Sequence, residues 1–332
     1  MSFRANDFLS DALLARLTEI RVSDPECALR AAASRERRTK LTLDGKLNIL
    51  AADHPARRVT GVGGNPLGMA DRHDYFARIV RVLMSGSVDG VMATMDILED
   101  LLILDVSGRD SFLKDKLLIA SLNRGGLAGS SWEMNDPMTG ATPAACAAWK
   151  LDGAKILMRI CDDEPDSLKT MMASAAAITE LNALDVPTFL EPLPVVKSEK
   201  GYKVIKSAEA LAKTVGVASA LGDSSRLLWL KLPYCENYEV VARATTLPIL
   251  LLGGESAGDP TGYFREVSAG MAAGANVRGA LVGRNVLYPG DDDPLAVAEA
   301  VGGIVHHGWQ AEQALALAKD VMRKKESQHQ AR

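Results

Sequence analysis

Lys231 and Glu191 are charged residues inside otherwise apolar runs, and together they could carry out imine chemistry. Lys231 lies within LLWLKLPY, and Glu191 lies within FLEPLP. A lysine among apolar neighbours has a lowered pKa, because its charged form loses solvation. The neutral amine can attack a carbonyl carbon and form a Schiff base, and a glutamate beside it can move the protons that C–C cleavage requires. A lysine that pairs with a carboxylate only for structure is the alternative.

Asp53 and Lys155 add a second carboxylate and a second amine to this predicted catalytic group. Asp53 follows the apolar run LNILAA, and Lys155 has the same parity as Arg159 in GAKILMRI, so the two side chains face one side of a strand. We expect Asp53 and Lys155 to position substrate hydroxyls and to tune charge. A satisfied ion pair is the alternative for each residue alone, but burying four such groups together would reduce stability.

The segments LLLGGESAGD and GALVGRNVL are typical of an anion site. They offer the amides of Gly253, Gly254 and Gly283, the hydroxyl of Ser256 and the guanidinium of Arg284. Backbone N–H groups at helix starts bind phosphate, and the loops after the last two strands of many (β/α)8 barrels do so. Tight turns are the alternative explanation for the glycines.

Further basic residues follow the first and third apolar runs. His54, Arg57 and Arg124 are predicted to bind substrate, and Arg57, Arg58 and Arg124 are candidate contacts for a second anionic end of it. The sequence has five histidines, and His54 and His73 are not spaced as a helical pair of metal ligands. We therefore predict neither a metal site nor a cofactor.

Eight short apolar runs, separated by helical patterns, would position these residues. The runs are 47–53, 88–95, 117–123, 153–160, 186–193, 226–234, 247–254 and 279–285, and the helical patterns are 71–85, 140–151, 164–184, 206–222, 235–245, 260–275 and 293–303, with a less regular one in 96–115. Runs that are apolar on both faces fit a covered parallel sheet. This alternation predicts an α/β fold, a single (β/α)8 TIM barrel, whose active site lies at the carboxyl ends of its strands. A doubly wound open sheet is the alternative, although no glycine-rich fingerprint follows the first run.

The barrel is expected over residues 45–305. An N-terminal helical extension over 1–44 would precede it, and a C-terminal helix and tail over 306–332 would follow. The basic run RERRTK (35–40) is predicted to be a solvated helix end, with an anion site as the alternative.

Composition excludes several classes of partner. The 332 residues carry a net charge of −4, which implies no broad basic surface for nucleic acid or a membrane. No apolar run approaches the roughly 20 residues of a membrane span, and no signal peptide is expected. The four cysteines are not spaced as C-x-x-C, which favours free thiols in the cytoplasm. We expect a cytoplasmic homo-oligomer.

The motifs AADH (51–54), GAKIL (153–157), FLEPLP (189–194), WLKLPY (229–234), LLGGESAG (251–258) and GALVGRNVL (279–287) resemble the class I aldolase superfamily. That superfamily contains deoxyribose-phosphate aldolase, archaeal-type fructose-bisphosphate aldolase and tagatose-bisphosphate aldolase. The resemblance implies a metal-independent barrel with Lys231 as the Schiff-base lysine and Glu191 as the acid/base. It also implies polar active-site roles for Lys155 and Asp53, and a phosphate cradle at the glycines and Arg284.

The sequence departs from the deoxyribose-phosphate branch, because LPILLLGGE lacks that branch's second lysine. The segment SLNRGGLAGSSWEMND (121–136) resembles a bacterial subgroup that is linked to inositol-type carbohydrate catabolism. The resemblance thus implies an aldolase for a phosphorylated sugar or sugar acid, such as 2-deoxy-5-keto-gluconate 6-phosphate, a ketose bisphosphate or sulfofructose phosphate. A barrel isomerase or synthase that uses Lys231 as a general base, and a non-catalytic sugar-phosphate-binding barrel, are the alternatives.

Overall fold

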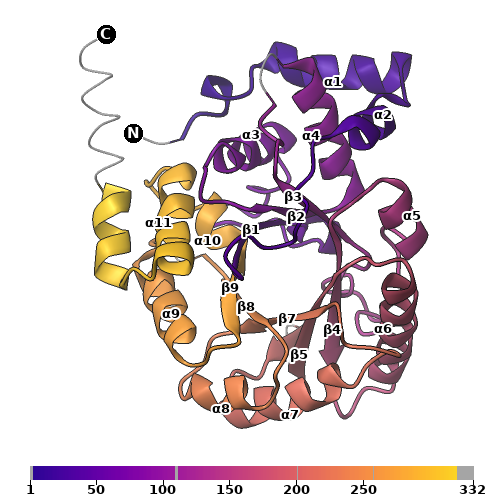
Figure 1. Ribbon diagram of the computed structural model, residues 1–332, viewed down its shortest axis with the longest axis vertical. Helices are drawn as coiled ribbons and strands as arrows, with labels where there is room; N and C mark the ends of the chain where they lie inside the picture. The colour runs from indigo at the N-terminus through magenta and orange to yellow at the C-terminus, as the bar shows by residue number, and fades with distance from the viewer. Residues whose placement is uncertain (1–2, 109–110, 200, 257, 320–332) are drawn as a thin grey trace.

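Eight parallel strands form a closed barrel in the part of the chain that the structure describes (Figure 1). The structure is a computed structural model that describes residues 3–108, 111–199, 201–256 and 258–319; the predicted tail beyond residue 319 lies outside them. The strands are β1 (Leu47–Ala52), β2 (Gly90–Ala93), β3 (Leu117–Ser121), β4 (Gly153–Ile160), β5 (Thr188–Ser198), β7 (Leu228–Pro233), β8 (Ile249–Leu252) and β9 (Val277–Val282). Pairing of β4 with β5 and of β1 with β9 closes the ring, so the predicted barrel is confirmed and the open sheet is excluded.

Helices surround the ring of strands. They are α3 (Arg72–Leu83), α4 (Met95–Ser107), α5 (Pro143–Ala148), α6 (Asp166–Ala183), α7 (Ala208–Ser219), α8 (Tyr238–Arg243), α9 (Thr261–Ala272), α10 (Arg284–Leu287) and α11 (Pro294–His307). Side-chain caps begin several of them: Asp71 accepts hydrogen bonds from the first turn of α3, and Thr142 and Ser207 do the same for α5 and α7. None of the described helices is long and apolar enough to span a bilayer.

Two helices precede the barrel, α1 (Asp11–Ser23) and α2 (Cys27–Ser34), and both contact α4. Short 3-10 turns lie at Ala5–Asp7 (η1) and His54–Arg57 (η2). Residues 311–319 are helical after α11. The division of the chain into an extension, a barrel and a tail stays a prediction.

Alternate side chains of the strands point into the ring and fill the part that lies toward the amino ends of the strands. Ile49, Ile119, Phe189, Leu250 and Leu281 belong to one buried apolar cluster inside the barrel. Trp229 packs against Phe189 there, with ring centroids 6.1 Å apart. On β3, β5 and β7 the next inward positions toward the carboxyl end are the polar residues Ser121, Glu191 and Lys231, so the barrel has a filled base and a partly polar mouth.

The basic run after α2 differs from both expectations. Helix α2 ends at Ser34, and the Arg35 side chain is 3% exposed against Asp152, with 2.6 Å between Nη2 and Oδ2. Arg37 also pairs with Asp152, and Arg38 pairs with Asp89. The run is therefore neither a solvated helix end nor a free anion site, because its guanidinium groups are bound to carboxylates that immediately precede β4 and β2. We call Arg35, Arg37, Arg38, Asp89 and Asp152 the basal arginine cluster.

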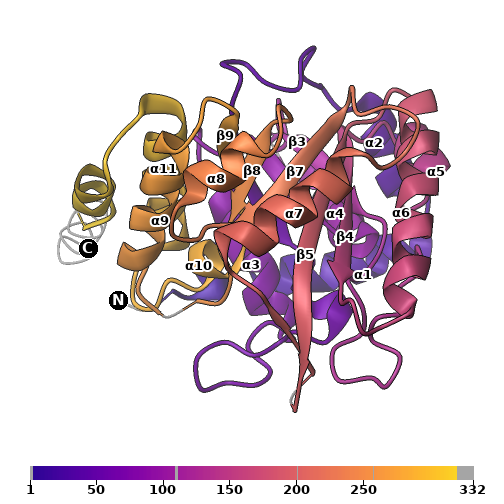
Figure 2. The same ribbon diagram turned by 90° about the horizontal axis from the view of Figure 1, so that it is seen from below.

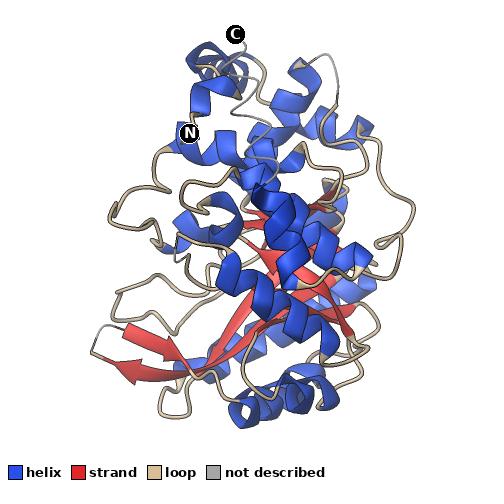
Figure 3. Ribbon diagram, turned by 90° about the vertical axis from the view of Figure 1, so that its left-hand side faces the viewer, coloured by secondary structure: helices blue, strands red, loops and turns tan. Residues whose placement is uncertain are grey.

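Strand β5 is longer than the sequence predicted and turns back as a hairpin. It continues through Pro194 to Ser198 and pairs antiparallel with β6 (Gly201–Val204). Figure 2 shows β5 extending beyond the ring, and Figure 3 shows the hairpin projecting from the barrel. The predicted run ends at residue 193. The carboxyl half of β5 instead lies beside β4 up to the pair Ile160–Pro194.

Candidate active site

Asp53, Lys155, Glu191 and Lys231 form one connected row across the carboxyl mouth of the barrel. Lys155 Nζ lies 3.0 Å from Asp53 Oδ2 and 3.1 Å from Glu191 Oε2. Lys231 Nζ donates a hydrogen bond to the same Glu191 oxygen at 2.9 Å. The structure therefore brings together all four residues that were predicted to be catalytic, and we call them the lysine–carboxylate cluster.

The strand register explains why these four residues meet. Phe189 pairs with Trp229 and with Lys155 in neighbouring strands, so Glu191 and Lys231 lie two residues closer to the carboxyl end than the Phe189–Trp229 layer. Side chains two residues apart on a strand share a face. Asp53 follows the last residue of β1. The polar row thus lies directly on the apolar filling of the barrel.

Burial and charge act differently on the two lysines. Burial lowers the pKa of Lys231, and the positive charge of Lys155 lowers it further. Attraction to Glu191 opposes this, but the pKa stays below its usual value. Lys155 is also desolvated, but Asp53 and Glu191 outweigh burial and raise its pKa. The Lys231 side chain is 8% exposed, and the Lys155 side chain is 2% exposed. Lys155 is thus held as a cation, whereas Lys231 is shifted toward the neutral amine.

Both carboxylates of the cluster stay ionised despite their burial. Desolvation opposes ionisation of Glu191, but the charges of Lys231 and Lys155 outweigh it and lower the pKa to about 2. Lys155 has the same effect on Asp53, whose pKa also falls well below its usual value. At neutral pH both carboxylates are therefore ionised and accept hydrogen bonds.

Ser121 is a member of this site that the sequence analysis did not identify. Its hydroxyl donates a hydrogen bond to Asp53 Oδ2 at 3.0 Å, and the residue is 2% exposed. Ser121 ends β3 and has the same parity as Leu117 and Ile119, which face the barrel interior. That parity was the available signal, because an inward polar residue at a strand end is in the position of a site residue.

The residues predicted to bind phosphate lie after β8 and β9. Gly254 has a φ of +68°, a left-handed conformation that favours glycine. At Gly283 a Cβ atom would come within 2.4 Å of His54 Cε1, so only glycine fits there. The Ser256 hydroxyl donates to the Tyr288 carbonyl at 2.7 Å and accepts from the Gly258 amide, so it is bound within its own loop.

Arg284 and His54 lie beside these glycines. The Arg284 side chain is 17% exposed, and 3.8 Å separates its Nη1 from the well-exposed Glu255. Burial lowers the pKa of Arg284, and its Nε is buried without a hydrogen-bond partner among the described residues. Burial also lowers the pKa of His54 to about 4, so its imidazole is neutral at neutral pH. Lys206, which the sequence analysis missed, has its Nζ 3.8 Å from the Cβ position of Gly254.

The three arginines proposed for a second anion lie in different surroundings. Arg57 faces Glu133, with 3.8 Å between Nη2 and Oε1, and burial together with Arg159 lowers its pKa. Arg58 is exposed in the left-handed position that ends η2. Arg124 is exposed, and its Nη1 donates to the Ala56 carbonyl at 2.9 Å. The three side chains therefore differ in exposure and in their partners.

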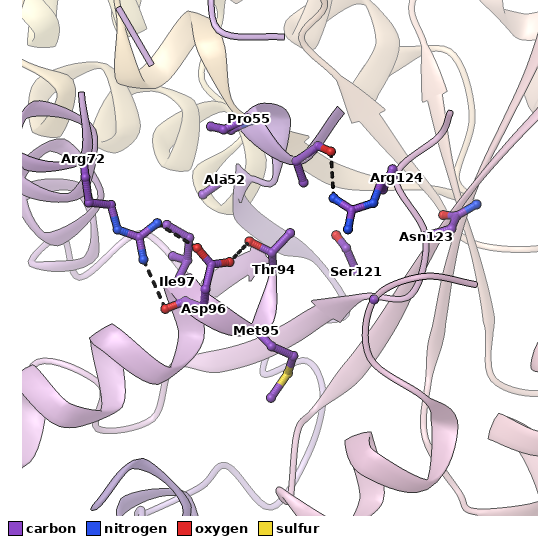
Figure 4. Close-up of a pocket in the computed structure, with 12 residues that line it drawn as sticks. Ala52, Pro55, Arg72, Thr94, Met95, Asp96, Ile97, Ser121, Asn123 and Arg124 are labelled. Atoms are coloured by element: carbon purple, nitrogen blue, oxygen red, sulfur yellow. Dashed lines mark hydrogen bonds and ion pairs between the residues drawn. The ribbon is translucent and has the colours of Figure 1, made fainter. Parts of the chain in front are cut away.

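A cleft of about 470 Å³ opens between the ends of β1, β2 and β3 (Figure 4). The lining residues are Ala52, Pro55, Ala56, Arg72, Thr94, Met95, Asp96, Ile97, Ser121, Asn123, Arg124 and Gly140. It is contiguous with the lysine–carboxylate cluster through Ser121. Among the residues that the structure describes, no group of three or more His, Cys, Asp or Glu side chains is arranged to hold a metal ion.

Comparison with known proteins gives a family and a fold. A family model described as Cgl0159-like matches residues 45–303. The crystal structure of Cgl0159 from Corynebacterium glutamicum has 36% sequence identity and a TM-score of 0.85, and the alignment covers 91% of this chain and 99% of that one.

More distant similarities are to aldolases. A Schiff-base-forming fructose-1,6-bisphosphate aldolase aligns with a TM-score of 0.57 and 20% identity over 79% of this chain and 95% of that one, which shows a common fold. A 2-amino-3,7-dideoxy-D-threo-hept-6-ulosonate synthase from Archaeoglobus fulgidus is 30% identical over 109 residues, which are 33% of this chain and 40% of the synthase. The chain thus matches about two fifths of the synthase. These comparisons confirm the predicted resemblance to the class I aldolase superfamily in fold.

Proposed function

The chain belongs to the Cgl0159-like family, and we propose that it is a class I aldolase that cleaves or forms a C–C bond in a phosphorylated sugar or sugar acid through an imine on Lys231. One observation carries this proposal. Glu191 Oε2 is shared by Lys231 Nζ at 2.9 Å and Lys155 Nζ at 3.1 Å at the buried floor of the mouth. An amine beside a carboxylate that can take its proton, next to a fixed cation, meets the needs of imine chemistry.

The reaction begins with transfer of a proton from Lys231 to Glu191. The neutral amine attacks the ketone carbon, and Glu191 returns the proton to the carbinolamine hydroxyl, which leaves as water and gives an iminium. Glu191 then accepts the proton of the substrate hydroxyl beyond the scissile bond. As that C–C bond breaks, its electron pair forms an enamine with the iminium group, and an aldehyde leaves.

The second half of the reaction regenerates the enzyme. The enamine carbon takes a proton from Glu191, which restores the iminium, and water hydrolyses the iminium to the ketone product and the free amine. Lys155, which Asp53 and Glu191 hold as a cation, stabilises negative charge on substrate oxygens. Asp53, fixed by Ser121 and Lys155, accepts hydrogen bonds from substrate hydroxyls.

The phosphate would bind at the loops after β8 and β9. We assign the amides of Gly253, Gly254 and Gly283 and the guanidinium of Arg284 to this role, with Lys206 as an additional cation. Two observations support this assignment. Arg284 Nε is buried without a hydrogen-bond partner among the described residues, and the Lys206 ammonium lies near Gly254. Neutral His54 would donate or accept a hydrogen bond on the substrate between phosphate and imine, and Ser256 would shape the loop.

The proposal extends to the setting of the enzyme. Cys27, Cys146, Cys161 and Cys235 are free thiols, which supports a cytoplasmic location. We propose a homo-oligomer that needs no cofactor. Among substrates, 2-deoxy-5-keto-gluconate 6-phosphate, ketose bisphosphates and sulfofructose phosphate are the first to assay.

Borohydride reduction in the presence of a carbonyl substrate tests the proposal. We expect a secondary amine on Lys231, located by peptide mass mapping, and no label in Lys231→Met. That variant should lose at least about 10⁴-fold in kcat, because the covalent step is removed, while its circular dichroism spectrum stays that of the wild type. A label on Lys155 would make the assignment of the nucleophile wrong. Turnover without any label would favour the general-base isomerase, and neither label nor turnover would favour a non-catalytic barrel.

A further inference from the structure

We infer that the cleft between β1, β2 and β3 binds an anionic group on the aldehyde half of the substrate, and that Arg124 determines specificity there. This inference rests on the proposed aldolase function and deepens it. The class of ligand is a short hydroxy- or oxo-aldehyde that bears a carboxylate or a phosphate.

The position of the cleft relative to Lys231 is the first argument. In the ring order β4-β3-β2-β1-β9-β8-β7-β5, strand β2 is four strands from β7 in either direction, so the cleft lies across the mouth from Lys231. The row from Lys231 through Glu191 and Lys155 to Asp53 runs toward it. A substrate that is attached to Lys231 and extends over this row reaches the cleft with the end that becomes the aldehyde.

The contact through Ser121 is the second argument. Ser121 lines the cleft and at the same time donates its hydroxyl to Asp53. The carboxylate that would bind substrate hydroxyls is therefore held by a wall of the cleft. A volume of about 470 Å³ lies within the range of small-molecule sites, and half of the residues that line it are polar or charged, as suits a polar ligand.

Several polar side chains of the cleft lining already have partners. Arg72 is paired with Asp96 and Asp100, so this side of the cleft is compensated (Figure 4). Asn123 uses its amide group on Asp136 and on the backbone of Leu157.

Arg124 differs from these neighbours. Its Nη1 donates to the Ala56 carbonyl, and no carboxylate among the described residues forms an ion pair with it. Figure 4 shows its guanidinium above Ser121, across the cleft from Arg72 and Asp96. A guanidinium group whose N–H donors are not all used can bind a carboxylate or a phosphate.

The surroundings also separate Arg124 from the other two candidate arginines. Arg57 already faces Glu133 and lies next to Arg159, and it is not part of the cleft lining. Arg58 is an exposed turn residue outside the lining. Of the three, only Arg124 lines the cleft.

Two matched pairs of acceptor aldehydes test this inference in the direction of synthesis, with dihydroxyacetone phosphate as the donor. Glycolaldehyde is compared with glyoxylate, and glyceraldehyde with glyceraldehyde 3-phosphate, so that each pair differs in one anion. We expect the wild type to prefer one anionic member at least about tenfold in kcat/KM. Arg124→Gln should lower kcat/KM for that acceptor by about tenfold to a hundredfold, the worth of a charge-assisted contact, and change the neutral acceptor less than about threefold.

The same kcat/KM measurements on the two acceptor pairs provide the control and the outcomes that would contradict the inference. Arg16→Gln removes an equal charge from an exposed position on α1 and should change neither acceptor. Preference within the first pair identifies a carboxylate site, and preference within the second identifies a phosphate site. Equal kcat/KM within both pairs, or a preference that survives Arg124→Gln, overturns the inference.

A binding measurement separates this inference from the aldolase proposal itself. 3-Phosphoglycerate carries both anions but no aldehyde or ketone group, so it binds without imine formation. Calorimetric titration of the wild-type and Arg124→Gln chains should show affinity that falls at least about tenfold in the variant, even where no aldol turnover is found. Equal affinity of the two chains contradicts the subsite, whether or not Lys231 is labelled by borohydride.

Discussion

Both ends of the barrel bury ion pairs, but the two ends differ in the cations that they use and in how carboxylate oxygens are shared. At the carboxyl mouth, two lysines lie on one oxygen of Glu191. At the base, Asp152 binds Arg35 and Arg37 through different oxygens and also accepts the Leu118 amide.

Arginine stays protonated in proteins, whereas a desolvated lysine can lose its proton. The basal arginine cluster contains no lysine, and its carboxylates are paired with guanidinium groups. Its carboxylates also accept backbone N–H groups where strands begin, as Asp89 does from Asn48 at 2.7 Å. Burial of charge alone therefore does not mark a site: the lysine–carboxylate cluster is suited to proton exchange, and the basal arginine cluster is suited to holding strand ends together.

The largest effect is expected at the mouth. Glu191→Gln keeps the shape of the side chain but removes the carboxylate that exchanges protons with Lys231. We expect kcat to fall by about 10²–10⁴-fold, as for the loss of a general acid/base, with a much smaller change in substrate affinity. Steady-state kinetics and calorimetric binding measure the two quantities. A near-normal kcat would remove Glu191 from the mechanism and weaken the contrast between the two ends.

The next effect concerns stability at the base. Asp152→Ala leaves the buried Arg35 guanidinium without its carboxylate, so we expect the free energy of unfolding to fall by about 3–5 kcal/mol. The kcat of the molecules that remain folded should stay within about twofold. Glu209→Ala is a control, because its pair with Lys213 is exposed and should contribute at most about 1 kcal/mol. Urea unfolding compares them; equal losses for the two variants would contradict a structural role for the cluster.

The smallest effect depends on pH. His306 lies beside the basal arginine cluster, with Nε2 3.1 Å from Asp89 and Nδ1 2.9 Å from Asp44. The hydrogen bond to Asp89 raises the pKa of His306 above its usual value, although burial opposes the shift. Because the raised pKa belongs to the folded state, this contribution to stability is complete below the unfolded pKa and is lost as pH rises through the folded pKa.

His306→Gln tests that pH dependence. Near pH 5.5 the variant should be about 1.5–3 kcal/mol less stable than the wild type, the range for hydrogen bonds to charged groups. The difference should shrink as pH rises above neutrality, while kcat remains unchanged. Unfolding in urea at several pH values measures it. A difference that is constant with pH would show that His306 acts at the base only as a neutral side chain.

The sequence by itself determined the barrel fold and which side chains face its interior near the carboxyl mouth. Eight apolar runs with intervening helical patterns specify the (β/α)8 fold, since periodicity and strand length are local properties. Parity and strand ends also placed Lys155, Glu191 and Lys231 on inward faces near the carboxyl mouth. These features needed no knowledge of which strand lies beside which.

Only the tertiary structure decided which groups share a partner. Lys155 and Lys231 meet at one oxygen of Glu191, and Ser121 meets Asp53 from 68 residues away, through the register of the closed barrel. Arg35 lies 117 residues from Asp152, so no local pattern showed that the Arg35 side chain would be buried. The composition of a segment predicts how its side chains alternate, but the pKa and the function of a charged group depend on partners that the closure of the sheet brings within hydrogen-bond distance.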